Sequence, residues 1–228
     1  MHAVILEHIE YEGSGYCEQW LQLHKAEISR VQLYNEHYIL PELAHVDLLI
    51  ICGGPMSIHD EHEYPWLKVE KAYIRQAIDN GCAILGLCLG AQLIASQCGA
   101  EIRRNDQAEI GWFELTGLSP DADTYRFPDT FTVMEWHYDT FDLPSGAHRL
   151  ASSPSCENQA FQIGRRIIGL QFHPEMTSAE IQYFIRDFSW ELKAEPGIQS
   201  ADVIERGITA YAGAANKLLA DILVYLSE

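Results

Sequence analysis

Short apolar runs alternate with amphipathic stretches along the first half of the chain. The runs lie at residues 3–6, 47–52 and 82–87, and residues 31–33 are a possible further strand. Uninterrupted runs of this length are typical of strands buried on both faces of a sheet. Apolar side chains at helical spacing lie at residues 16–28, 65–78 and 91–95. Because strands that alternate with helices are joined by right-handed crossovers, the pattern predicts an α/β fold with a mostly parallel central sheet.

The pattern changes between residues 111 and 170, where Gly, Pro, Ser and Asp separate short apolar segments. These segments lie at residues 112–115, 130–136, 148–152, 159–163 and 167–171. We expect them to be strands joined by turns, which add an antiparallel or mixed part to one side of the sheet.

Helical spacing returns at residues 178–192 and 203–226. No internal repeat, low-complexity tract or linker divides the chain. We therefore expect a single domain over residues 1–228, with its core at about 1–192 and a C-terminal helical extension at 193–228.

The chain is strongly acidic, which bears on its partners. Its 228 residues include 15 Lys and Arg against 33 Asp and Glu, a formal net charge of −18. Such a charge repels phosphate backbones and anionic lipid, so we expect neither nucleic acid nor a membrane surface as a partner. Solubility is the simplest interpretation of the acidity.

The cysteines and the N-terminus both bear on location. Six cysteines occur without any CxxC pair, which is typical of free thiols in a reducing compartment. The first residues lack a basic start and a long apolar run, so no signal peptide is expected. Residues 80–100 carry no charge, but Gly, Gln and Ser interrupt them, which argues against a membrane span. We expect a soluble, cytoplasmic protein.

A candidate nucleophile follows the apolar run 82–87. Gly86-Leu87-Cys88-Leu89-Gly90 matches the G-x-nucleophile-x-G turn that joins a strand to a helix. Such a turn strains the backbone of the nucleophile and needs glycines where other backbone crowds in. The helix N-terminus favours a thiolate at Cys88 and offers the Leu89 N–H to a developing oxyanion. Alone, the pattern fits a buried cysteine in a glycine-rich turn equally well.

A candidate base follows the apolar run 167–171. His173 and Glu175 come directly after it, with Pro174 restricting the backbone between them. A cysteine nucleophile needs a base, and the base needs an orienting carboxylate. By itself this pair is more simply an ordinary polar strand end. Together with the turn at Cys88, it forms a specific combination.

The segments GLCLGAQ and QFHPE resemble those of the class I (triad) glutamine amidotransferases, near the stand-alone branch that is similar to the amidotransferase domain of GMP synthase. The resemblance runs from about residue 48 to residue 175. It implies a flavodoxin-like sheet with additional antiparallel strands and a triad of Cys88, His173 and Glu175. It also implies that Gly54 supplies a second oxyanion N–H beside that of Leu89.

The resemblance further implies a set of substrate-binding residues. Gln92, four residues after the nucleophile, matches the position that helps to hold the substrate glutamine. His137, Tyr138 and Asp139 match the stretch whose backbone contacts the α-amino and carboxylate groups of glutamine. His137 and Asp139 could also mimic a second catalytic pair, but structural or substrate-orienting roles fit better beside a stronger triad.

The resemblance implies a glutaminase that hydrolyses the side-chain amide of glutamine through a γ-glutamyl thioester and releases ammonia. Two alternatives stay open: a γ-glutamyl peptidase or hydrolase with the same triad, and an inactive regulatory or binding protein that keeps the fold without turnover. An ammonia-accepting synthetase is a possible partner. The chain has neither a Ser-Gly-Gly-x-Asp-Ser loop nor a P-loop, so no cofactor is expected.

The acidic stretch 57–64 contains two histidines among several carboxylates. A metal site, a substrate-covering loop and a solvated loop are all compatible with this composition. No regular element fixes these side chains, so we expect no metal there.

Overall fold

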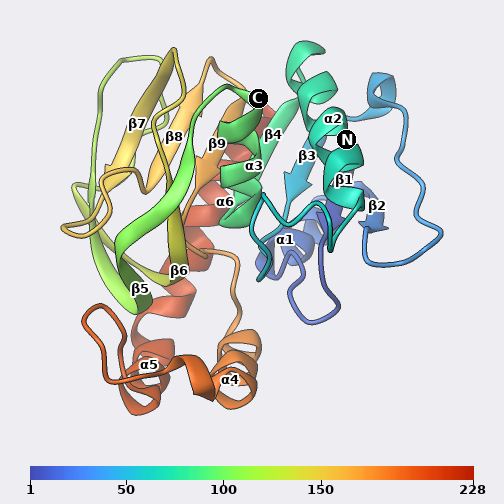
Figure 1. Cartoon of the computed structure of the whole chain (residues 1–228). Coiled ribbons are helices and arrows are strands. Elements are labelled where there is room, and N and C mark those ends of the chain that lie inside the picture. The colour runs from blue at the N-terminus through green and yellow to red at the C-terminus, as the bar shows by residue number, and fades with distance from the viewer.

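A computed structural model describes all residues, 1–228. Its centre is one nine-stranded sheet with the order β2-β1-β3-β4-β9-β8-β7-β5-β6, shown in Figure 1. The strands are β1 (His2–Glu7), β2 (Glu27–Gln32), β3 (Leu48–Ile51), β4 (Ala83–Leu87), β5 (Ile102–Gly117), β6 (Thr130–Phe141), β7 (Ala147–Ser152), β8 (Ala160–Ile163) and β9 (Ile167–Leu170).

The sheet has a parallel part and an antiparallel part, as the sequence predicts. β2, β1, β3, β4 and β9 are parallel neighbours, in the strand order of flavodoxin-like folds. β8, β7, β5 and β6 pair antiparallel beside them. Because β4 and β9 are parallel neighbours, the segments that leave their carboxyl ends lie side by side. Those segments carry Cys88 and His173.

Helices cover both faces of the sheet. They are α1 (Tyr16–Leu23), α2 (Trp66–Asp79), α3 (Leu89–Gln97), α4 (Ser178–Asp187), α5 (Ala201–Gly207) and α6 (Gly213–Ser227). α1 and α6 contact each other, and so do α2 and α3. α4 and α5 form a separate small layer beneath the ends of β5 and β6, as Figure 1 shows.

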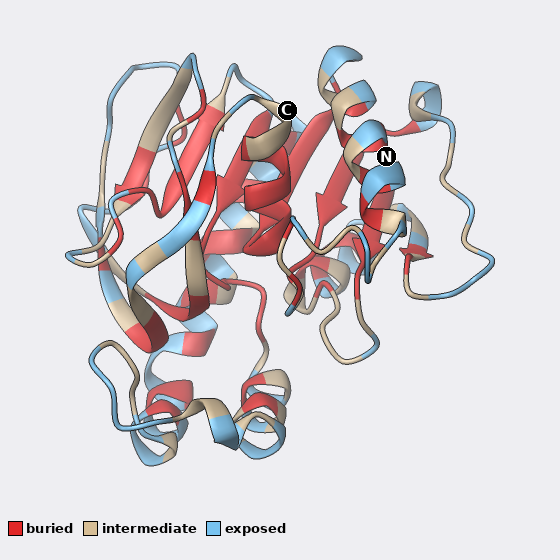
Figure 2. Ribbon diagram, in the orientation of Figure 1, coloured by how far each residue is buried: buried red, intermediate tan, exposed pale blue.

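Alternate side chains of the parallel strands point to opposite faces of the sheet and pack into two separate hydrophobic cores. Ile5 and Ile50 pack with α1 and α6, whereas Leu6 and Ile51 pack with α2 and α3. This period of two is the geometry of a strand covered on both faces. The central strands are accordingly buried along their whole length in Figure 2. A third core joins β5 and β6 to α4 and α5.

Two expected boundaries were wrong near the N-terminus and in the antiparallel part. The helix expected at 16–28 ends at Leu23, because Lys25 takes a positive φ of 54° and the chain then enters β2. The strand expected at 112–115 is far longer, since β5 begins at Ile102. Arg103 and Arg104 on its first half are exposed, so no apolar run marks that half in the sequence.

The C-terminal helices also differ in detail from the expectation. The helix expected at 178–192 is α4 followed by a 3₁₀ turn, Ser189–Glu191. The helix expected at 203–226 is α5, a π-helical turn (Ile208–Ala212) and α6. No helix is both long and apolar enough to cross a membrane. All six cysteines are free.

Candidate active site

Cys88 lies in a strained turn between β4 and α3. Its φ is 47° and its ψ is −104°, a conformation that L-residues rarely adopt. The turn is crowded: a Cβ on Gly86 would lie 2.6 Å from the Gly90 carbonyl carbon, and one on Gly90 would collide with Ile51 O. Both glycines are therefore required by the close approach of backbone, as the elbow pattern predicts.

His173 and Glu175 come together beside this turn. His173 Nδ1 lies 2.7 Å from Glu175 Oε1, and both side chains are buried. Burial acts to lower the pKa of His173, but Glu175 and Cys88 oppose it, so the pKa lies well above its usual value. The second ring nitrogen, Nε2, is left for Cys88 and for substrate. The structure therefore brings the three expected triad residues to one place.

Cys88 and His173 open onto a cavity of about 600 Å³. Cys88, His173, Gln92 and residues 136–139 line it, together with the Gly54 loop. Further lining comes from outside the parallel sheet: Phe184 of α4, and Phe188, Trp190, Glu191 and Lys193 after it. A cavity of this size, with few convergent polar groups and a free thiol, is typical of a small-molecule site.

Gln92 takes part in a chain of hydrogen bonds that reaches the sulfur. Its Nε2 donates to Gln171 Oε1 at 3.2 Å and lies 3.5 Å from Asp139 O. Gln171 Nε2 in turn donates to Cys88 Sγ at 3.4 Å. The sequence pointed to Gln92 but not to Gln171, which forms the direct contact with the nucleophile.

The glycine loop after β3 is fixed by a buried pair, His8 and Glu70, which we did not predict from the sequence. His8 Nδ1 lies 2.7 Å from Gly53 O, and Nε2 lies 2.7 Å from Glu70 Oε1. A carbonyl can only accept, so Nδ1 carries a proton. Burial acts to lower the pKa of His8, but Glu70 raises it, and the net shift is upward. The pair thus fixes the carbonyl next to Gly54.

A signal for this pair was present in the sequence. Glu70 lies on the buried stripe of α2, between Leu67 and Ile74. A carboxylate at a position where an apolar side chain is expected requires a buried partner. His8 directly follows β1, at the same carboxyl edge of the sheet as Cys88.

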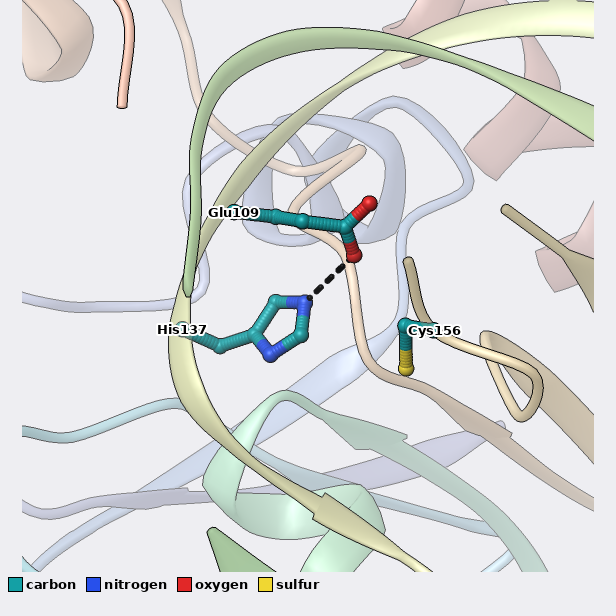
Figure 3. Close-up of side chains that lie close together, drawn as sticks. All are labelled: Glu109, His137 and Cys156. Atoms are coloured by element: carbon teal, nitrogen blue, oxygen red, sulfur yellow. Dashed lines mark hydrogen bonds and ion pairs between the residues drawn. The ribbon is translucent and has the colours of Figure 1, made fainter. Parts of the chain in front are cut away.

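His137 lies in a second buried group, with Glu109 and Cys156 (Figure 3). The ligand atoms of these three lie within 4.8 Å of one another. His137 Nε2 is 3.2 Å from Glu109 Oε2 and 3.4 Å from Glu135 Oε2. Its Nδ1 lies 2.9 Å from Asp139 O. With a carbonyl at one nitrogen and two carboxylates at the other, the ring is best described as an imidazolium.

The hydrogen bonds of Glu109 close this group. Oε1 accepts from Ser153 Oγ and from Ser155 Oγ, each at 2.7 Å. Oε2 accepts from Gln159 Nε2 at 2.7 Å as well as from His137. All lone pairs of the carboxylate are therefore engaged by protein donors. The geometry is that of a hydrogen-bonded ion pair, and a metal would have to displace these donors.

The stretch 57–64 contributes to the cavity only through its first residues. Ser57 and Asp60 line the cavity, and Ser57 N donates to Asp60 at 2.7 Å. His59 and His62 are exposed. Glu61 pairs with Lys71 of α2 at 2.7 Å. The loop is thus tied to α2 and borders the site.

Comparisons with known proteins concern the chain as a whole. A sequence model of the family "Glutamine amidotransferase class-I" matches residues 18–192. The glutamine amidotransferase-like protein YfeJ of Salmonella typhimurium is 30% identical over 204 residues, covering 86% of this chain and 84% of YfeJ. The glutamine-hydrolysing GMP synthase subunit of Saccharolobus solfataricus is 31% identical over 172 residues, covering 75% of this chain and 89% of its relative.

The fold is also shared with solved structures. The crystal structure of a glutamine amidotransferase from Thermotoga maritima superposes with a TM-score of 0.91 at 28% identity, covering 100% of this chain and 98% of that one. The match of the family model over most of the chain, and the identity to full-length relatives, lead to one conclusion. The chain belongs to the class I glutamine amidotransferase family.

Proposed function

We propose that this chain is a cysteine-dependent glutaminase in which Cys88, His173 and Glu175 form the catalytic triad. One observation carries the proposal. Cys88, whose backbone is strained, lies at the start of α3. Its thiol is next to the imidazole of His173, whose Nδ1 lies 2.7 Å from Glu175 Oε1. A helix N-terminus and an imidazolium both favour the thiolate.

The steps follow from these positions. The Cys88 sulfur attacks the side-chain amide carbon of glutamine, and the carbonyl oxygen becomes an oxyanion. The N–H groups of Leu89 and Gly54 are our candidates for stabilising that oxyanion. His173 then gives its proton to the departing nitrogen, the C–N bond breaks, and a γ-glutamyl thioester and ammonia result. Water, deprotonated by His173, hydrolyses the thioester to glutamate and the free thiol.

Residues around the cavity are proposed to hold the glutamyl part. Gln92 and the backbone of residues 137–139 line the cavity on the side of Gln171. The His137 ring is occupied by Glu109 and Asp139, so we assign its contribution to the backbone. Tyr138 lies under the Arg104 guanidinium, whose Cζ is 4.2 Å from the ring centroid.

The proposal includes a location and a mode of action. Six free thiols support the expected cytoplasmic location. The similar GMP synthase chain is glutamine-hydrolysing by name, which supports a possible ammonia-accepting synthetase as partner. We favour a chain that turns over alone, because the Gly53 carbonyl beside the oxyanion loop is already fixed by His8 without any partner.

The test is steady-state ammonia release from glutamine, and amine release from γ-glutamyl dipeptides, with no ATP and no second protein. We expect measurable turnover of glutamine that is lost in Cys88→Ala and kept in Cys156→Ala. Preference for dipeptides would favour a γ-glutamyl hydrolase instead. Background rates on every donor would contradict the proposal of a self-sufficient enzyme, since one missing oxyanion donor costs about a hundred- to a thousand-fold in rate.

A further inference from the structure

One carboxylate in the catalytic cavity has no partner. Glu12 lies in the loop between β1 and α1, in a tight turn where Ile9 bridges to Glu12. Its side chain lines the cavity together with Cys88 and His173. No backbone or side-chain donor hydrogen-bonds to the Glu12 carboxylate, which interacts with its surroundings only through charge. A carboxylate in such a place is costly unless a ligand pairs with it.

The Glu12 carboxylate lies next to the catalytic imidazole. A Cβ on Gly53 would collide with Glu12 Oε1 and would lie 3.1 Å from His173 Cε1. The two groups thus approach each other across Gly53, and only a glycine leaves room for this. Cε1 lies between the two ring nitrogens: Nδ1, which contacts Glu175, and Nε2, which is left for the substrate. Glu12 therefore borders the catalytic imidazole in the cavity that it shares with Cys88, where a leaving nitrogen would receive its proton.

The surroundings of Glu12 favour a cation as its partner. Burial raises the pKa of Glu12 to about 7; His173 and His8 lower it, while Glu175 and Glu180 raise it. Near neutral pH the group can therefore either hold a proton that it can donate or carry a negative charge. Amide hydrolysis produces the matching group at this place, because ammonia is a base that becomes ammonium in water.

We propose that Glu12 forms a leaving-group subsite, which binds the departing amine as an ammonium ion. The inference rests on the proposed function. As the S–C bond forms and the C–N bond breaks, His173 Nε2 supplies one proton and neutral ammonia results. A second proton, from the Glu12 carboxyl group or from water, yields ammonium paired with the Glu12 carboxylate. The nitrogen lone pair is then unavailable for attack on the thioester, and water completes the reaction.

The first test compares two glutamyl donors that differ only in the leaving group. Glutamine releases ammonia, which takes up a proton, whereas glutamic acid γ-methyl ester releases methanol, which stays neutral. Glu12→Gln keeps the size and removes the charge. We expect kcat/KM for glutamine to fall about 10- to 100-fold and that for the ester to change less than about threefold. Glu12→Asp should recover part of the loss.

A matched control is available in the same loop. Glu10 is exposed, so Glu10→Gln makes the same charge change outside the cavity and should leave both donors unaffected. An equal loss on both donors in Glu12→Gln would overturn the inference, since it would mean that Glu12 positions His173 or binds the α-ammonium group common to both. No loss on either donor would overturn it as well.

A second test does not depend on turnover, and so separates failure of the subsite from failure of the proposed function. It measures the rate of Cys88 alkylation by iodoacetamide in ammonium chloride and in sodium chloride at equal ionic strength. An ammonium ion beside His173 should slow alkylation of the wild-type protein but not of Glu12→Gln. The same rate in both salts for the wild-type protein, or equal slowing in the two proteins, would contradict the subsite even if neither donor is hydrolysed.

Discussion

The molecule contains two groups made of a cysteine, a histidine and a glutamate, and they differ in what surrounds them. In the first group Cys88 and His173 open onto a cavity of about 600 Å³, with Glu175 hydrogen-bonded to His173. Glu109, His137 and Cys156 are closed off by serine and glutamine donors. In the first group one imidazole nitrogen is left for the sulfur and the substrate. In the second group both nitrogens are taken by the protein.

The difference shows that residue types alone do not make a site. Cys88 begins a helix at a positive φ of 47°, which exposes its sulfur to the helix N-terminus. Cys156 is buried, and burial raises the pKa of its thiol above the usual value, although His137 lowers it. We therefore expect the first group to be reactive and the second to stabilise the fold.

The largest effect should separate the two cysteines. Cys88→Ala removes the nucleophile, and we expect kcat for glutamine to fall at least about 10⁵-fold. Cys156→Ala removes a sulfur that contacts Thr140 at 3.3 Å, and kcat should stay within about threefold. Steady-state ammonia release measures both. Comparable losses in the two variants would contradict the division of roles.

The second-largest effect should be a difference in kcat between the alanine variants of His173 and His137. We expect His173→Ala to lower kcat nearly as far as Cys88→Ala, and also to lower stability, because it leaves the buried Glu175 without its partner. His137→Ala leaves Glu109 and Glu135 buried without their cation, and should cost about 3–5 kcal/mol of stability while kcat falls less than tenfold. Kinetics and urea unfolding on the same samples give both quantities. If His137→Ala abolishes turnover in a folded protein, His173 is not the base.

Glu175 and Glu109, the carboxylates hydrogen-bonded to the two histidines, should differ less in their effect on kcat. Glu175→Gln keeps the shape but not the charge that stabilises the imidazolium, so kcat should fall about 10³- to 10⁴-fold. Glu109→Gln should lower stability with kcat within about tenfold, because the partners of Glu109 all lie outside the proposed triad. The measurement is kcat at a temperature where circular dichroism shows both variants folded. A larger kcat loss in Glu109→Gln than in Glu175→Gln would reverse the assignment.

The smallest effect concerns Glu135, beside His137. Burial raises the pKa of Glu135 to about 7, against an opposing effect of His137. The folded protein thus binds a proton more tightly than the unfolded chain, so this group lowers stability as pH rises from about 4.5 to 7. Relative to the wild-type protein, Glu135→Gln should gain about 1–3 kcal/mol between pH 5 and pH 8.

Urea unfolding at both pH values tests this, with Glu114→Gln as a control, since Glu114 is exposed on β5. The control should show the same pH dependence as the wild-type protein. A stability difference between Glu135→Gln and the wild-type protein that does not change with pH would contradict a raised pKa for Glu135.

The sequence predicts β1, β3, β4 and β9 well, because these strands are apolar runs. In contrast, β2 was expected only at 31–33, since Glu27, Ser29 and Arg30 break its apolar pattern. The sequence also predicts the first half of β5 poorly, because its exposed Arg103 and Arg104 show no period.

The three candidate triad residues could be picked out because each follows a strand within a recognisable motif. His8 was missed although Glu70, on the buried stripe of α2, indicates a buried partner. Glu12 was missed because only the fold brings the loop after β1 against Gly53.

The most direct test of the central claim is covalent labelling with a diazoketone that mimics glutamine. Cys88 alone combines a helix N-terminus with an imidazole that has a free nitrogen, so it alone should provide a reactive thiolate. Mass spectrometry of peptides from labelled protein should show one adduct per chain, at Cys88, and none at Cys156 or the other four cysteines. Labelling at Cys156, or no labelling at all, would contradict the assignment of Cys88 as the nucleophile.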